Sequence, residues 1–535
     1  MSGNKIVKGA AILGIAGLIV KLLGVFLKIP LTAMIGEEGM AYYGYAYPLY
    51  SLFLVIATAG IPVAISRLVS EKIAIRDYAG AHNVFKVSRG LLLFIGVVSF
   101  AICYFGADWI AKYVFADMGA LLPMKAIAPA LIFVPVMSAY RGYFQGRQNM
   151  NPTAVSQFIE QIVRVGVGLL LAFYLLDVSL EAAAAGATFG ATAGSVGGLL
   201  VIVIIYLCNK KAINYYIKKN RHYNQRERKR DIIKQIIWIS VPITIGAAIL
   251  PIVNFADSML VTRRLVAGGF DLEIARNMYG QLSAYCNTMV GLPAVLTQAI
   301  AVAMVPAVAA AYKLNKTNEV HDNINLGLRI SMIMGMPCAV GMAVLAEPIL
   351  LLLFPSNPAG VASAAPTLMI MCISVVQSAV LQTTTGVLQA VGKQSLPVVN
   401  LAIGAVAKIV FTYLFVAIPA LNIMGAALAT VVFYTIALTL NIYHVVKYTN
   451  VKINVVLNFV KPSIAALLMG AAAFASFKLI YKVLESSNMA CLLAICIGVV
   501  VYGILILMTK AITKEEIARL PKGDKLVRIL DKFVK

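Results

Sequence analysis

A change from apolar to basic sequence at residue 208 decides the fold: residues 183–208 read AAAGATFGATAGSVGGLLVIVIIYLC, and residues 209–234 read NKKAINYYIKKNRHYNQRERKRDIIK. The first stretch is long and apolar enough to cross a bilayer as one helix, which takes about 20 residues. The second holds ten Lys and Arg residues against two acids. A basic segment directly after an apolar span is typical of the cytoplasmic side of a membrane protein.

Apolar runs of this kind recur along the whole chain. Apolar residue types make up 61% of the 535 positions, charged residues make up 13%, and the mean hydropathy is +0.88. These values predict an all-α polytopic membrane protein with about 14 transmembrane helices. The expected spans are 10–35, 43–68, 87–106, 121–142, 154–176, 183–208, 235–262, 280–311, 327–353, 364–389, 395–418, 424–446, 459–484 and 489–511.

The net charge of +23 indicates a membrane surface and not nucleic acid, because the cations are concentrated in two places. One is segment 209–234, and the other is the tail 510–535, with eight cations against four acids. Connections on the opposite side carry acids, among them Glu37, Glu38 and Asp117, with Arg263, Arg264 and Arg276 as the main exception. The bias predicts a multi-pass protein of the cell membrane whose two termini are both cytoplasmic, which an even number of spans allows.

No motif for a metal, a cofactor or catalysis stands out. The seven cysteines include no CxxC pair and the four histidines are far apart in the sequence, so we expect no metal site. The nearest approach to a phosphate-binding loop, from Gly386 to Lys393, has one residue too many and is followed by Gln394 instead of Ser or Thr. We therefore expect no cofactor and no enzyme activity.

The basic linker divides the first twelve spans into two sets of six that resemble each other. The stretch YFQGRQNMNPTAVSQFIEQIVRVGVGLLLAFYL begins at Tyr143, and VLQAVGKQSLPVVNLAIGAVAKIVFTYLF begins at Val387. Arg164 aligns with Lys408 in this pair. Since each set has an even number of spans, the two form a parallel repeat, with a substrate site expected between them. Similar composition of the two segments is the alternative explanation.

The repeat divides the chain into five parts. We expect an N-terminal six-helix lobe (1–208), the basic cytoplasmic linker (209–234) and a C-terminal six-helix lobe (235–452). Two extra transmembrane helices follow in 453–511. The last part, 512–535, has apolar residues at helical spacing among cations, which predicts an amphipathic cytoplasmic helix.

Charged residues inside the spans carry the functional hypothesis, since each costs about 2.5–3.5 kcal/mol at the bilayer centre. Lys21 and Lys28 share one face of the first span. Lys21 is too deep to reach water easily, so we expect it to line a polar cavity, whereas Lys28 could instead extend to the interface. The fifth span carries a polar stripe in which Glu160 and Arg164 can pair at i,i+4. The rest of the stripe is Gln157 and Gln161.

The seventh and eleventh spans add further candidates for substrate binding. These are Asn254, Asp257, Arg263 and Arg264 on the seventh span and Lys408 on the eleventh. Cations outnumber acids among all these residues, so the cavity should attract an anion, and arginine offers a two-pronged donor for phosphate. The alternatives are structural ion pairs between helices and, for Arg263 and Arg264, a marker of the outer helix end.

Four stretches carry a resemblance to a known family. They are GEEGMAYYGYAYPLY from Gly36, AGIPVAISRLVSE from Ala59, RGYFQGRQNMNPTAVSQFIEQIVR from Arg141 and NFADSMLVTRRL from Asn254. They resemble the polysaccharide-exporter branch of the multidrug/oligosaccharidyl-lipid/polysaccharide superfamily, and within it the MurJ-type lipid II flippases and the stage V sporulation protein B group. The likeness extends over essentially the full length.

The resemblance implies two six-helix lobes in a V shape, a central cationic cavity with a basic residue at Lys21, and a groove for a polyprenyl tail formed with the two extra helices. A second basic family position aligns at Leu27, beside Lys28. Some relatives bind sodium through acids on the seventh and eleventh helices. Here Asp257 is present, but the eleventh span offers Asn400 and no acid, which argues against sodium coupling.

The function implied by the resemblance is flipping of lipid II, an undecaprenyl-pyrophosphate-linked peptidoglycan precursor, from the inner to the outer leaflet by alternating access. The expected partners are the membrane, this anionic lipid-linked substrate and cell-wall synthesis proteins. A flippase for another polyprenyl-linked glycan, a multidrug exporter of the same superfamily and a non-transporting scaffold are the alternatives. The coupling ion or membrane potential, a role in sporulation and the oligomeric state stay open.

Overall fold

Helices form the protein throughout the residues that the computed structural model describes, which are 2–220, 227–509 and 511. Side chains are described from residue 17 onward, except at 18, 21, 295, 296, 299, 300, 302 and 303. The first α-helices are α1 (Ser2–Thr58), α2 (Ile61–Ala74), α3 (Tyr78–Phe105), α4 (Ala107–Trp109), α5 (Leu121–Ile127), α6 (Ala130–Gly146), α7 (Asn151–Leu175), α8 (Leu180–Lys219), α9 (Lys229–Ala267) and α10 (Leu272–Gln281).

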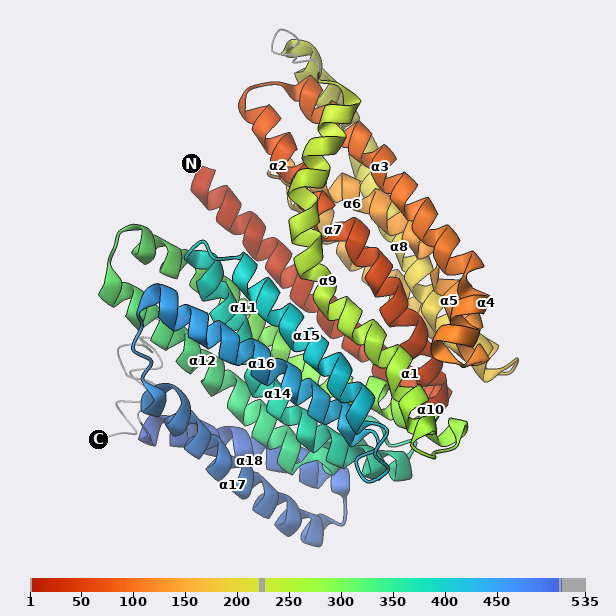
Figure 1. Cartoon of the computed structure of the whole chain (residues 1–535), viewed down its shortest axis with the longest axis vertical. Helices are drawn as coiled ribbons and strands as arrows, with labels where there is room; N and C mark the ends of the chain where they lie inside the picture. The colour runs from red at the N-terminus through yellow and green to blue at the C-terminus, as the bar shows by residue number, and fades with distance from the viewer. Residues whose placement is uncertain (1, 221–226, 510, 512–535) are drawn as a thin grey trace. The chain divides into compact units, whose positions relative to one another are not determined.

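The later α-helices are α11 (Asn287–Lys313), α12 (Thr317–Val344), α13 (Ala346–Leu353), α14 (Pro358–Ala390), α15 (Ser395–Phe415), α16 (Met424–Thr449), α17 (Lys461–Leu484) and α18 (Ser487–Met508). Short π-helical or 3-10 segments are η1 (Ile110–Phe115), η2 (Met118–Ala120), η4 (Leu282–Cys286) and η5 (Val456–Val460). Figure 1 shows these elements along the chain.

The fold is that of an all-α polytopic membrane protein, as the sequence predicted. Within the described residues, twelve segments are long and apolar enough to cross a membrane. One of them, Leu22–Ala74, covers the first two expected spans, and the expected span 280–311 falls on α11, where several side chains are not described. The expected number of 14 is therefore approximate. The amphipathic helix expected at 512–535 lies outside the described residues.

A single glycine divides α1 into two arms. The sequence predicts a connection at 36–42, but the helix is interrupted only at Gly36, with φ of 64° and ψ of −168°. Positive φ is readily adopted by glycine because it has no Cβ. The first arm of α1 (2–35) and the second arm of α1 (37–58) are both drawn in red in Figure 1, where the second arm leads on to α2.

Contacts group the chain into two compact units. The first unit is Met1–Thr288 with Ala405–Ala429, and the second is Met289–Gly404 with Thr430–Lys535, so α15 and α16 contribute to both. Large residues such as Phe85 and Tyr143 fill a core between α2, α3, α6, α8 and α9 in the first unit. In the second unit, residues such as Leu328 pack among α11, α12, α14 and α16. The lobes 1–208 and 235–452 stay a prediction.

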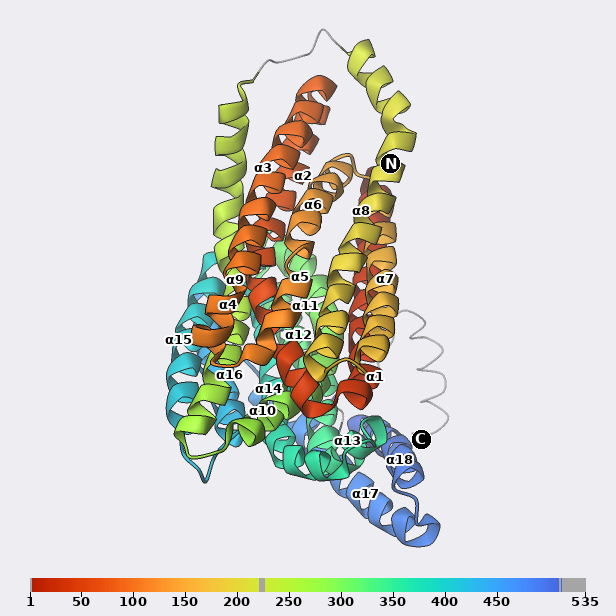
Figure 2. The same cartoon turned by 90° about the vertical axis from the view of Figure 1, so that its right-hand side faces the viewer.

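Equivalent helix pairs of the two halves pack through glycine at the same register. α7 lies beside α8 (Figure 2), and a Cβ at Gly186 would be 2.8 Å from the carbonyl carbon of Leu171. A Cβ at Gly425 of α16 would be 2.6 Å from the carbonyl carbon of Phe415 of α15. Leu171 and Phe415 each lie seven residues after the aligned pair Arg164 and Lys408. This shared close approach supports a true repeat, because composition alone does not set register.

The described part of the basic linker is helical at both ends. α8 is 40 residues long, which at 1.5 Å per residue is about 60 Å, twice the thickness of a bilayer's hydrocarbon core. It extends to Lys219, and α9 begins at Lys229. Ser179 caps the other end of α8, where its Oγ accepts a hydrogen bond from the backbone N–H of Ala182 at 3.1 Å. Seven of the ten cations of the linker therefore lie on helices that extend past the apolar spans: Lys210, Lys211, Lys218, Lys219, Lys229, Arg230 and Lys234.

Candidate functional site

The polar stripe of α7 faces both arms of α1. The guanidinium carbon of Arg164 is 5.0 Å from the centroid of the Tyr47 ring, a cation–π contact with the second arm. On the first arm, a Cβ at Gly24 would be 3.5 Å from Nε2 of Gln161, which precedes Arg164 by about one turn. Gly24 and Tyr47 lie 12 and 11 residues from Gly36. The two arms therefore meet α7 at matching distances from the kink.

Lys28 joins the first arm to η4. Its side chain is half-buried, and Nζ donates a hydrogen bond to the carbonyl oxygen of Ser283 at 3.3 Å. Leu27, which aligns with a basic family position, is only 2% exposed and packs in the apolar core, so the charge at this level of α1 comes from Lys28. Lys21 belongs to the first arm, but its side chain lies outside the described residues.

The expected pair between Glu160 and Arg164 is wrong. Glu160 instead accepts a hydrogen bond from Nη2 of Arg141 on α6, at 2.8 Å from Oε2, and Nε of Arg141 also donates to Oγ of Ser156 at 2.9 Å. Arg141 of α6 therefore makes two hydrogen bonds to α7, one to Glu160 and one to Ser156. Arg164 contacts the ring of Tyr47 instead of Glu160. Arg141 was missed by the sequence analysis, although it begins one of the quoted family stretches.

Asp257 and Lys408 form an ion pair between α9 and α15. The Nζ of Lys408 is 2.6 Å from Oδ2 of Asp257, and only 7% and 19% of the two side chains are exposed. Lys408 is therefore already neutralised, unlike Arg164, its partner in the repeat. Asp257 is the acid that the seventh span offered for a sodium site, and the ammonium group of Lys408 occupies it.

Arg263 and Arg264 bind backbone carbonyls on two different elements. Nη2 of Arg263 donates to the carbonyl oxygen of Tyr113 in η1 at 2.7 Å. Nε of Arg264 donates to the carbonyl oxygen of Tyr413 in α15 at 2.9 Å, and its guanidinium carbon lies 3.9 Å from the centroid of that tyrosine's ring.

Two further residues of the predicted site are uncharged. The side chain of Gln157 is half-buried and that of Asn254 is exposed.

The charge balance of the predicted site is positive within the described residues. Its two acids, Glu160 and Asp257, are each paired with a cation. Lys28, Arg164, Arg263 and Arg264 have no described carboxylate within 4.0 Å; carbonyl oxygens and tyrosine side chains hold them instead. In the described part of the chain, no group of three or more His, Cys, Asp or Glu residues could hold a metal.

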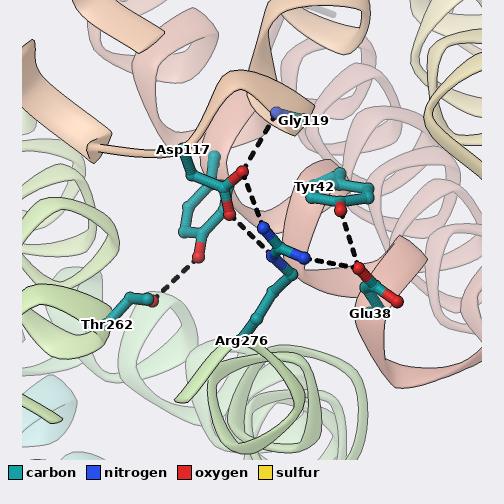
Figure 3. Close-up of polar contacts among 7 residues, drawn as sticks. Glu38, Tyr42, Asp117, Gly119, Thr262 and Arg276 are labelled. Atoms are coloured by element: carbon teal, nitrogen blue, oxygen red, sulfur yellow. Dashed lines mark hydrogen bonds and ion pairs between the residues drawn. The ribbon is translucent and has the colours of Figure 1, made fainter. Parts of the chain in front are cut away.

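A second polar cluster, which we call the Arg276 cluster, joins α10 to α1 and to the start of η2. Figure 3 shows Arg276 between two carboxylates: Nε and Nη2 donate to Asp117 at 2.8 and 3.1 Å, and Nη1 donates to Oε1 of Glu38 at 2.6 Å. Tyr42 donates to the same Glu38 oxygen at 2.8 Å. Burial would lower the pKa of Arg276, but its hydrogen bonds and charge interactions with Asp117 outweigh this and raise the pKa.

The contact between α10 and α1 extends beyond the Arg276 cluster, along the second arm of α1. Glu37, next to the kink, accepts hydrogen bonds from Nε2 of Gln281 and from the hydroxyl of Tyr285, both at 2.9 Å. Tyr279 donates to the carbonyl oxygen of Gly44 at 2.8 Å. A Cβ at Gly280 would overlap the carbonyl oxygen of Glu37, so only glycine fits there. The second arm is therefore held along α10 and η4.

Sequence reasoning did not assign this contact. From the sequence, Glu37, Glu38 and Asp117 were interpreted only as markers of the outer side of the membrane, with Arg263, Arg264 and Arg276 as the main exception. The signal was that exception, because arginines among acids at the same membrane face are natural partners for them. The position of Arg276 on a short helix, far from these acids in the sequence, left its partners unspecified.

Comparisons with known proteins agree with this architecture. The sequence model of the family described as "Polysaccharide biosynthesis protein" matches residues 6–312, and a second model, MatE, matches residues 283–414. The chain is 28% identical to Stage V sporulation protein B of Bacillus subtilis (strain 168), over 98% of this chain and 100% of that protein. It is also 28% identical to Lipid II flippase MurJ of the same strain, over 81% of each.

A solved structure shares the fold. The structure described as "Lipid II flippase MurJ, inward closed conformation" has a TM-score of 0.67 and 16% sequence identity, and the match covers 93% of this chain and 98% of that chain. At this identity the likeness concerns the fold alone.

Proposed function

The chain belongs to the polysaccharide biosynthesis protein family, and on this basis we propose that it moves an anionic, lipid-linked cell-wall precursor of the lipid II type from the inner to the outer leaflet. It is a multi-pass membrane protein of a flippase and transporter superfamily. The finer assignment, to a pyrophosphate-linked substrate, depends on the charges of the candidate site.

The observation that carries the proposal is the unequal pairing of charges in the candidate site. The two acids of the site are bound to Arg141 and Lys408, whereas Arg164 contacts the ring of Tyr47, hydrogen-bonds the side chains of Tyr43 and Tyr47, and has no described carboxylate partner. A guanidinium has five N–H donors, so the two tyrosines leave Arg164 enough of them for two parallel hydrogen bonds to a phosphate. Lys21 and Lys28, on the first arm, would add point charges to the same anion.

The Arg276 cluster supports a transport cycle with a closed outer side. α1 belongs to the predicted N-terminal lobe and α10 to the predicted C-terminal lobe, and the cluster joins them on the side expected to face outward. Alternating access requires such a contact to form when the inner side is open and to break for release. In this proposal, loading from the inner leaflet takes place while Arg276 holds Glu38 and Asp117.

An apolar cavity of about 380 Å³ supports a place for part of the lipid tail. It lies between α13, α14 and α17, and its lining includes Leu351, Met369, Phe474, Phe477 and one acid, Glu347. The two extra helices, α17 and α18, contribute to it or pack beside it. A chain truncated after Lys452 should insert but fail to flip its substrate, and full activity of that chain would exclude this role.

A multidrug exporter is the second candidate, favoured by the match of the MatE model to residues 283–414. Exporters of organic cations need acids that are available to the substrate. In the described part of the candidate site, Glu160 and Asp257 are both occupied by cations of the chain. This arrangement disfavours a cationic substrate.

Complementation of a flippase-depleted strain tests the proposal. A charged hydrogen bond contributes about 1.5–3 kcal/mol, so losing one should weaken binding by about 10- to 150-fold. Arg164→Ala and Lys21→Ala should each abolish growth and outer-leaflet exposure of lipid II at normal protein levels. Lys21→Arg should retain much of the function, because the charge is kept.

The control is Lys211→Ala, which removes an exposed cation from the basic linker and should be silent. If Arg164→Ala and Lys21→Ala both complement fully at normal expression, the cationic-site mechanism is wrong. Export of a cationic dye by the purified, reconstituted protein, lost on Asp257→Asn, would favour the multidrug alternative.

A further inference from the structure

A second basic pocket lies in the first unit, apart from the arms of α1 and the polar stripe of α7 that form the proposed transport site. It is a cavity of about 380 Å³ between α3, α6 and α8. Its floor is aromatic: the ring centroid of Phe85 is 4.9 Å from that of Tyr140 and 5.4 Å from that of Tyr206. Its polar lining includes Lys86 and Arg89 of α3 and Lys210 of α8.

These three cations have no acidic partner in the part of the chain that the structure describes. None forms an ion pair there, and the pocket lining holds no Asp or Glu. Arg89 is oriented by neutral groups alone, since Nη1 donates to the hydroxyl of Tyr140 at 3.2 Å and the guanidinium lies 5.8 Å from the centroid of Phe85. Three cations with no compensating acid are a binding site for an anion, and a phosphate fits both their charge and their hydrogen bonds.

The pocket lies at the predicted edge of the membrane. The expected spans begin at residue 87 in α3 and end at residue 208 in α8, so Lys86, Arg89 and Lys210 all fall within three residues of that boundary. Phosphate headgroups of a bilayer lie at this level. The basic linker follows directly, which places the pocket at the leaflet that the linker faces, predicted to be the cytoplasmic one.

Apolar stripes lead from the pocket into the membrane. On α8, Leu200, Ile204 and Leu207 are each more than half exposed, share one helix face, and end at the pocket, which Leu207 lines. On α3, Leu93 and Val97 are exposed at four-residue steps after Arg89. A soluble anion would make no contact with these stripes, whereas the acyl chains of a lipid bound in the pocket would cover them. The stripes therefore favour a lipid over free phosphate as the ligand.

We propose that this pocket binds the headgroup phosphate of an anionic glycerophospholipid, with its acyl chains along the exposed stripes of α3 and α8. Lys86, Arg89 and Lys210 surround the phosphate, and the polar headgroup extends toward Asn214 at the water side. The lipid would be a resident of the membrane and not the transported substrate, because the pocket is built from α3, α6 and α8 and not from the arms of α1 with α7.

Native mass spectrometry of the full chain in detergent tests the site. The probes are phosphatidylglycerol and phosphatidylcholine with the same acyl chains. Wild-type protein should bind the first phosphatidylglycerol at least 10-fold more tightly than phosphatidylcholine. The variant Lys86→Gln/Arg89→Gln/Lys210→Gln should lose this preference, with affinity for phosphatidylglycerol down about 10- to 100-fold. The matched control, Lys211→Gln/Lys218→Gln/Lys219→Gln, removes the same charge outside the pocket and should keep the preference.

Three results would overturn the proposal: equal binding of both lipids by the wild type, an unchanged preference in the pocket variant, or displacement of phosphatidylglycerol by millimolar inorganic phosphate. The last would mean a free-anion site. Should the triple variant fail to fold, photolabelling settles the matter with wild-type protein. A phosphatidylglycerol with a photoreactive acyl chain should label peptides of α3 and α8, and labelling confined to other helices would contradict the site.

Discussion

Arg276 and Asp117 form a two-pronged ion pair, with Nε to Oδ2 at 2.8 Å and Nη2 to Oδ1 at 3.1 Å. Asp117 is only 3% exposed and its Oδ1 also accepts the backbone N–H of Gly119 at 3.0 Å. Parallel hydrogen bonds of this kind combine charge with fixed geometry. Since Glu38 binds the third side of the same guanidinium, the contact between α10 and α1 is expected to break as one unit.

Arg276→Ala should weaken this contact strongly. It leaves the buried Asp117 without its counter-charge, and removing one partner of a buried pair costs about 3–5 kcal/mol. The measurement is the reactivity of Cys286, which is fully buried in η4, in a chain whose other six cysteines are replaced. A thiol reagent should modify Cys286 faster in Arg276→Ala, and Arg276→Lys should lie between.

The control for this experiment is Lys313→Ala, which removes an exposed cation at the end of α11. Its rate of Cys286 modification should equal that of the parent chain. Equal rates for Arg276→Ala and its parent would mean that the Arg276 cluster does not hold this contact closed.

The pair between Asp257 and Lys408 should show strong coupling in a double-mutant cycle. Asp257→Asn leaves a nearly buried ammonium unpaired and should lower the thermal stability of the purified protein by an amount equivalent to about 3–5 kcal/mol. Asp257→Asn/Lys408→Met should recover most of that loss, since both charges are gone. Additive effects of the two single changes would show that the pair contributes no interaction energy.

Gly36→Ala should destabilise the protein, because φ of 64° with ψ of −168° lies in a backbone region essentially restricted to glycine, where another residue costs roughly 1–3 kcal/mol. The change should lower the midpoint of thermal unfolding and the yield of correctly folded protein. Gly90→Ala is the matched control: Gly90 is helical within α3 and a Cβ there would meet nothing within 4 Å. It should be neutral or slightly stabilising, and a similar loss from both changes would argue against strain at Gly36.

The orientation of the chain can be measured at the end of α8. In a chain without its native cysteines, of which Cys208 and Cys496 are exposed, Asn220→Cys should resist a membrane-impermeant thiol reagent in intact cells. It should react once the cells are opened. Ready labelling of intact cells would place the basic linker outside and reverse the expected topology.

The fold class was predictable because the hydropathy and the length of a single segment suffice to identify a membrane span. Apolar runs of about 20 residues predict spans wherever they occur, and the repeat was found because Arg164 and Lys408 keep their register. The interruption of α1 at Gly36 was harder to predict from the sequence. Gly36 and the following acids predicted a connection, but the backbone needs only one residue at positive φ to change direction, and hydropathy does not detect a single dihedral angle.

The charged residues of the candidate site were chosen from the sequence, but the ion pair of Glu160 was not predicted. Glu160 and Arg164 share a helix face, which favoured the local i,i+4 pair. The structure gives Glu160 to Arg141, because a cation from the neighbouring helix brings a second hydrogen bond with it. Spacing along one helix cannot predict which side chain of another helix arrives there. The same reason hid the Arg276 cluster, whose three charged members come from distant parts of the sequence.

The position of Gly36 has a mechanical consequence for the first arm of α1. The glycine is covalently next to Glu37, which Gln281 and Tyr285 hold in place, so the second arm is anchored immediately beyond the hinge. Rotation about φ or ψ of this one residue would swing the arm that carries Lys21 and Lys28, while Tyr47 stays where it is. The lysines and Arg164 would then change their mutual distance, with loss of the hydrogen bond from Lys28 to Ser283 and of the packing of Leu27, which makes Gly36 a pivot whose angle sets how far apart the anion-binding charges lie.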